Sequence, residues 1–141
     1  MDMTATTYSH ATVNSMSGET IKTILEDVCD NLFNPDPYYQ QGGEMVRVGG
    51  LQSTCNPVAP MGKRIEDMRM HGQPIDVSRQ YKVAGWAPVA EEAKSAPGVR
   101  PVWEVVEEWM RSRNDVVQAR RPNLPKLIGG LPNPGMTRDA T

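Results

Sequence analysis

The chain has 141 residues, a formal net charge of −2 and a hydrophobic fraction of 38%, with 12 glycines and 12 prolines. This length fits one domain rather than two. The charge argues against a general nucleic-acid binder, which would carry a basic face. No stretch has the ~18 consecutive apolar residues of a membrane-spanning helix, and the start lacks the basic segment and apolar run of a signal peptide.

The clearest pattern near the N-terminus is one apolar stripe with helical spacing. The residues of this stripe are Ile21, Ile24, Leu25, Val28, Cys29 and Leu32. Ser17 can cap the first turn. Asn34-Pro35 ends the helix, because a residue before proline avoids helical angles. A short strand is expected before this helix, at 12–16.

The middle of the chain is expected to form short strands. They are predicted at 45–48, 51–55, 65–70 and 81–84, the second continuing the first after a glycine bulge. His71-Gly72 suits a tight hairpin turn after the third strand. A second helix is predicted from about Pro101, where an apolar stripe resumes. This order predicts an α+β domain, with helices packed on a mixed sheet, over residues 1–121. Residues 122–141 are rich in proline and glycine and are expected to form an extended tail.

Catalytic machinery is hard to find in the sequence. Its two histidines, His10 and His71, lie far apart, whereas catalytic metal sites usually need three or more side-chain ligands. Neither a phosphate-binding Gly-rich loop nor a serine nucleophile elbow is present. We therefore assign no catalytic residue and no metal ligand. Cys29 is expected to be a buried thiol on the apolar helix face, and a disulfide between it and Cys55 is left open, because one pair is no disulfide framework.

A candidate binding surface follows the first helix. Gly42 and Gly43 would let the backbone approach a ligand closely. Arg47 lies between two valines and so points away from their face; its planar fork suits an oxyanion such as sulfate or sulfonate, unless it is an ordinary surface arginine. Tyr39, one of two adjacent tyrosines, either plugs its loop onto the core or faces a ligand. Trp86, after a strand, either lines the site or fills the core.

Several segments resemble a known family. Residues 17–27, 64–75 and 81–84 are similar to the carboxy-terminal domain of the 5′-nucleotidase family. The unusual run at 30–43, followed by 45–50, resembles one branch of it, the SoxB thiosulfohydrolases (sulfate thiol esterases) of the thiosulfate-oxidising Sox system. Shorter similar segments are 84–87 and 125–135.

The resemblance implies a specific activity for the complete enzyme. Family members carry two manganese ions in an amino-terminal metallophosphoesterase domain. They hydrolyse S-sulfonate groups from a cysteine of the carrier protein SoxYZ, release sulfate and are periplasmic. The carboxy-terminal domain closes over the metal domain and shapes the substrate channel. Arg47, Gly42, Gly43, Tyr39 and Trp86 would form part of this channel's wall.

We expect the chain to begin inside this carboxy-terminal domain, so that the metal ligands are absent and the chain is inactive alone. A sheet that lacks its first strands would leave an unpaired edge, and we expect self-association there. Two other interpretations stay open. One is a nucleotidase-type substrate-binding domain, although the single phenylalanine, Phe33, argues against base stacking. The other is a stand-alone interaction module that pairs with a separately encoded metal domain.

Overall fold

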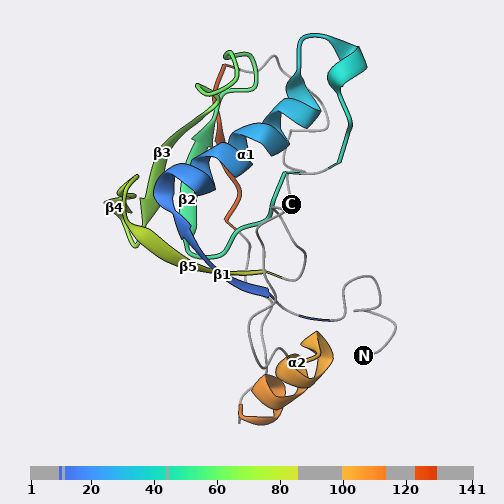
Figure 1. Ribbon diagram of the computed structural model, residues 1–141, viewed down its shortest axis with the longest axis vertical. Coiled ribbons are helices and arrows are strands. Elements are labelled where there is room, and N and C mark those ends of the chain that lie inside the picture. Colours follow the sequence, from blue (N-terminus) through green and yellow to red (C-terminus); the bar gives the residue numbers. More distant parts are fainter. Residues whose placement is uncertain (1–9, 11, 44, 86–99, 114–122, 130–141) are drawn as a thin grey trace, which may run out of the picture. The chain divides into compact units, whose positions relative to one another are not determined.

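The computed structural model describes residues 10, 12–43, 45–85, 100–113 and 123–129. The elements, in chain order, are β1 (Thr12–Ser17), α1 (Gly18–Phe33), the 3-10 helix η2 (Pro37–Tyr39), β2 (Leu51–Cys55), β3 (Ile65–Met70), β4 (Gln73–Pro74), β5 (Gln80–Gly85), α2 (Val102–Arg111) and β6 (Lys126–Leu127). Figure 1 shows these elements along the chain. The predicted α+β class, with mixed sheets and two α-helices, is confirmed.

The chain divides into two compact units. One combines residues 1–18 with 78–121, and the other combines 19–77 with 122–141. The second unit contains α1 and a four-stranded sheet in the order β4-β3-β2-β6. β2 pairs antiparallel with β3 and parallel with β6, so the sheet is mixed. The edge strands β4 and β6 each have two residues. Self-association through a sheet edge stays a prediction.

The hairpin between β3 and β4 follows the predicted turn chemistry. His71 and Gly72 have φ values of 52° and 78°. Two consecutive left-handed residues are what a tight hairpin turn of this kind requires, and glycine adopts that conformation without a steric penalty. Met70 pairs with Gln73 directly across the turn. The predicted strand and hairpin over this region are therefore confirmed.

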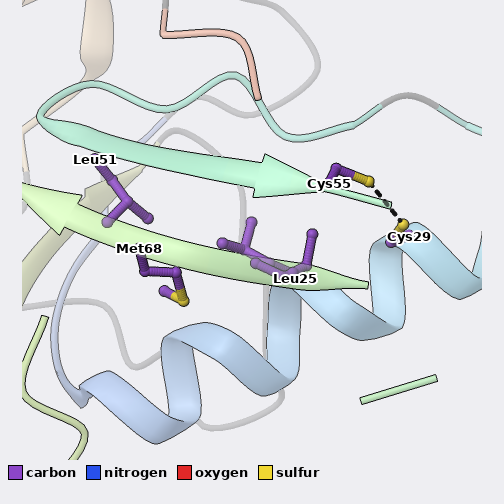
Figure 2. Packing of buried hydrophobic residues seen from close by; sticks show 6 residues of the cluster. Leu25, Cys29, Leu51, Cys55 and Met68 are labelled. Atoms are coloured by element: carbon purple, nitrogen blue, oxygen red, sulfur yellow. Dashed lines mark hydrogen bonds between the residues drawn. The ribbon is translucent and has the colours of Figure 1, made fainter. Parts of the chain in front are cut away.

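The core of this unit lies between α1 and the sheet. Its buried members are Leu25, Cys29, Leu51, Cys55, Ile65 and Met68, and Figure 2 shows α1 contributing Leu25 and Cys29 against side chains from β2 and β3. Ile21, Leu25 and Cys29 of the predicted stripe pack in this core, and the prediction that Cys29 is buried is confirmed. Burial of such a stripe contributes roughly 25 cal/mol for each Å² of apolar surface.

The other unit pairs β1 with β5 as an antiparallel ribbon, from Thr12 opposite Gly85 to Ser17 opposite Gln80. Both strands were predicted at nearly these bounds. Pro101 stands immediately before α2, where its missing N–H costs nothing. Glutamates lie along α2 and Arg111 lies in its last turn, where it donates two hydrogen bonds to Glu107. This order of charges favours the helix dipole.

One local prediction was wrong. Residues 45–48 do not form a strand; Val48 makes only an isolated bridge with Asn123, whose amide donates to the Val48 carbonyl at 3.2 Å. A strand needs a partner along its length, and the left-handed Gly50 (φ 81°) redirects the chain before β2 begins. Ser17 is the last residue of β1 and stands immediately before α1, and its capping role stays a prediction. The amides of Gly18 and Glu19 donate to the backbone carbonyls of Arg79 and Val77.

Candidate functional site

The segment after α1 is an ordered loop that its own polar side chains stabilise. Asp36 caps η2, because its Oδ1 accepts a hydrogen bond from the Tyr38 amide at 3.0 Å. The Asn34 side chain accepts from the Asp36 amide at 3.0 Å. The side-chain amide of Gln40 donates a hydrogen bond to the backbone carbonyl of Asn34 at 2.7 Å. The loop therefore has a defined shape, and its one helical turn, η2, begins at Pro37, where a missing N–H is tolerated.

The two tyrosines of this loop face solvent. Tyr38 is 89% exposed and Tyr39 is 60% exposed. Their rings meet edge to face, with centroids 5.7 Å apart and planes at 88°. Aromatic pairs favour this geometry, which helps to hold both rings in place. The sequence left open whether Tyr39 plugs its loop onto the core. The structure instead presents its ring on the surface, where it is available to a ligand or to another domain.

Gly42 and Gly43 follow with φ values of 80° and 105°. These values lie in the region that L side chains rarely adopt, so the backbone conformation requires glycine here. The Gly42 amide donates to the Asn31 carbonyl in α1 at 3.1 Å. A Cβ atom at either position would meet no described atom within 4 Å. The backbone is therefore open on that side, as expected of a close-approach surface.

Arg47 lies on the stretch that returns from this loop to β2. It is exposed, whereas Met45, Val46 and Val48 are half-buried against the core. The expected opposition between the arginine and the flanking valines is therefore present, even though the stretch is not a strand. Tyr39, Gly42, Gly43 and Arg47 thus lie along one exposed segment between α1 and β2. Trp86 lies outside the described residues.

The sequence analysis did not anticipate a buried arginine, Arg64, that ties the end of α1 to the loop 59–65. Arg64 is 2% exposed. Its Nε donates to the Ala59 carbonyl at 2.8 Å, and its Nη2 donates to the Phe33 carbonyl at the end of α1 at 3.4 Å. Its Nη1 forms an ion pair with Asp30. Hydrogen bonds from this guanidinium and from Asn34 hold the pKa of the Asp30 carboxyl below its ordinary value.

A second carboxylate of α1 supports the same loop, 59–65. Glu26 is 3% exposed and accepts three backbone N–H groups. The donors are Gly62 at 2.8 Å, Arg64 at 3.2 Å and Ile65 at 2.8 Å. Glu26 and Asp30 are four residues apart and so lie on one helix face beside the apolar stripe. That spacing was the available signal, but carboxylates are usually solvated, and nothing in the sequence places Arg64 opposite them.

The described residues offer no ligand set for a metal. No group of three or more His, Cys, Asp or Glu residues could hold an ion in the part of the chain that the structure describes. The two manganese ions of the SoxB family therefore do not fit the residues described. Within the same ranges, no helix is long and apolar enough to cross a membrane.

The fold and the family comparison define the class of protein. The domain family described as 5′-nucleotidase, C-terminal domain matches residues 6–97, and the chain belongs to this family. Among solved structures, the sulfate thiohydrolase SoxB of Thermus thermophilus, in complex with glycerol, is 37% identical, with a TM-score of 0.76. The match covers 89% of this chain and 23% of that protein, so the chain spans about a quarter of SoxB's length.

A second structure supports the fold alone. The putative 5′-nucleotidase of Staphylococcus aureus, in complex with alpha-ketoglutarate, is 17% identical with a TM-score of 0.58; the match covers 84% of this chain and 27% of that one. Comparison with curated proteins finds no match. The predicted 5′-nucleotidase C-terminal fold and the resemblance to SoxB are therefore confirmed.

Proposed function

We propose that this chain is the substrate-side part of a SoxB-type thiosulfohydrolase, which releases sulfate from cysteine S-sulfonate groups on the SoxYZ carrier. The observation that carries the proposal is the 37% identity to SoxB over 89% of the chain. The exposed segment between α1 and β2 adds to it. That segment offers an arginine fork, open glycine backbone and a presented tyrosine ring, which together suit an anionic group on a protein arm.

In this proposal the chain binds and shields the substrate, and another domain performs the hydrolysis. Arg47 donates paired hydrogen bonds to the sulfonate oxygens, since a guanidinium fork matches an oxyanion. The backbone at Gly42 and Gly43 passes close to the carrier arm, and Tyr39 lines the channel. The metallophosphoesterase domain supplies a metal-activated hydroxide when its manganese is bound. The chain alone is then inactive, and the complete enzyme works in the periplasm.

The test is a fused enzyme in which this chain replaces the matching carboxy-terminal part of the Thermus SoxB. Sulfate release from the S-sulfonated carrier is measured with manganese present. The proposal predicts turnover by the fused enzyme and none by the chain alone. It also predicts no turnover when the chain is mixed with a separately made metal domain. Restored activity in that mixture would support a stand-alone module instead.

The choice of substrate distinguishes the nucleotidase interpretation from the proposed function. Nucleotidase sites would stack a base on an aromatic ring. Phe33 is half-buried against the core, but the exposed Tyr38 and Tyr39 rings could stack a base, so an assay has to decide. The same fused enzyme is therefore assayed with nucleoside monophosphates as well as with the carrier. Faster hydrolysis of the nucleotides than of the carrier would overturn the proposal.

A further inference from the structure

Two sulfur atoms face each other inside the core. Cys29 comes from α1, and Cys55 is the last residue of β2. Their Sγ atoms are 3.4 Å apart, and both residues are fully buried, at 0% exposed. Figure 2 shows the two side chains meeting between the helix and the strand. The two thiols are joined by a hydrogen bond, so they are a specific pair and not two separate small apolar fillers.

The backbone around both cysteines is held from several sides. Cys55 pairs with Ile65 on β3 and with Leu127 on β6. Its carbonyl accepts from the Ile128 amide at 3.0 Å. Cys29 lies within α1, which Glu26 ties to the start of β3 through the Ile65 amide. The sulfur atoms are therefore held opposite each other by the fold itself. Their separation of 3.4 Å exceeds an S–S bond of ~2.05 Å by about 1.4 Å, so bond formation requires the two side chains to move towards each other.

We propose that Cys29 and Cys55 form an intramolecular disulfide that links α1 to β2 within the core. The oxidant is a small-molecule disulfide such as oxidised glutathione. One cysteine, as thiolate, attacks it to form a mixed disulfide and releases one glutathione thiolate. The second cysteine, as thiolate, attacks the protein sulfur of that mixed disulfide and releases the second glutathione. The protein loses two protons and two electrons, and the oxidant gains the electrons as two thiols.

The timing of the reaction follows from burial. Desolvation, with a contribution from the neighbouring thiol, raises the pKa of Cys29 to about 12 in the folded domain, and desolvation also raises the pKa of Cys55. Only the thiolate attacks a disulfide, so the folded, reduced domain reacts slowly. The bond forms while the chain folds, before α1 closes on the sheet. Once formed, it is shielded from reductants by the same packing.

The disulfide would close a loop between positions that are 26 residues apart. Such a link restricts the unfolded chain more than the folded one and so raises the melting temperature. For a chain of this size, we expect a rise on the order of 10 °C between the reduced and oxidised forms. This inference does not depend on the proposed enzymatic function.

The experiment uses the full chain, unfolded and reduced, then refolded in a buffer of oxidised and reduced glutathione. Intact mass and a peptide map are recorded without reductant. The expected product is a monomer lighter by two hydrogen atoms, with Cys29 and Cys55 in one cross-linked peptide pair, and with a raised melting temperature. Thiols that stay free to alkylation, a glutathione adduct or a dimer linked through these cysteines would each overturn the proposal. A cross-linked chain that melts below the reduced one would do the same.

Two further measurements distinguish a specific disulfide between Cys29 and Cys55 from general thiol oxidation. Oxidation of the folded, reduced chain should be at least tenfold slower than oxidation during refolding, and urea should accelerate it, because opening exposes the thiols. The single variants Cys29→Ser and Cys55→Ser should lose the difference in melting temperature between oxidising and reducing buffer. If either variant fails to fold, the mass and the peptide map of the wild-type chain still decide the matter.

Discussion

Removing the carboxylate of Glu26 should cost the domain much of its stability. This side chain is 3% exposed and accepts the backbone N–H groups of Gly62, Arg64 and Ile65. In Glu26→Ala, the buried amides of Arg64 and Ile65 lose their acceptor, as does the amide of the exposed Gly62. Each buried unsatisfied group costs about 1–3 kcal/mol, so the loss in the free energy of unfolding should be at least about 2 kcal/mol.

The variant Glu26→Gln gives a graded result. One amide oxygen remains, and it can serve the two donors that Oε2 accepts, those of Gly62 and Arg64. The amide nitrogen then faces the Ile65 N–H, so one buried donor lies against another. The expected loss is about 1–3 kcal/mol, which lies between the wild type and Glu26→Ala. Asp27→Ala is the matched control, because Asp27 is the next residue of α1 and is exposed.

The assay is urea unfolding at pH 7, followed by far-ultraviolet circular dichroism, which reports on α1. The control should change the free energy of unfolding by no more than about 0.5 kcal/mol, and the slope against urea should stay unchanged in all variants. If Glu26→Ala stays within about 1 kcal/mol of the wild type, or matches Asp27→Ala, the buried carboxylate does not hold the 59–65 loop.

Two predictions concern pH. Because the pKa of Asp30 is lowered in the folded state, its contribution to stability is fully present above its ordinary value of about 4 and is lost as the pH falls through the folded value. The urea midpoint of Asp30→Asn should therefore approach that of the wild type between pH 6 and pH 3; a constant difference would contradict this. The thiol pKa of Cys29 is raised, so the reduced domain should lose stability as the pH rises from about 9 towards 12. The oxidised form lacks the titrating thiols and should lose less over that range; equal losses would contradict the assignment.

The elements that the sequence predicted best are those with a strong local signal. The helix over 18–33 combines an apolar stripe with a proline stop, and the hairpin at 71–72 has a residue pair whose backbone preferences define the turn. Segment 45–48 has strand-like composition but only one bridging partner. Strand formation depends on pairing with a distant part of the chain, which local composition does not reveal.

In the candidate site, too, features with a local sequence signal could be predicted and long-range contacts could not. The glycine conformations at Gly42 and Gly43 could be anticipated, because glycine pairs mark positions of unusual backbone geometry. The burial of Glu26 and Arg64 could not, since each charge looks solvated until the fold brings the two elements together. The contact between Cys29 and Cys55 likewise depends on the packing of α1 against β2. Contacts between residues far apart in the sequence depend on the topology of the fold, which a short stretch of sequence does not reveal.

We propose that this chain supplies the surface that binds an anionic sulfonate. The most direct test is sulfate release by the fused enzyme carrying Arg47→Ala or Arg69→Ala. Both arginines belong to the same unit, and Arg69 makes a surface ion pair with Asp67 on β3. A charge-assisted hydrogen bond is worth about 1.5–3 kcal/mol, so Arg47→Ala should lower kcat/KM roughly tenfold or more, while Arg69→Ala stays near the wild type. Equal activities of the two variants would contradict the account.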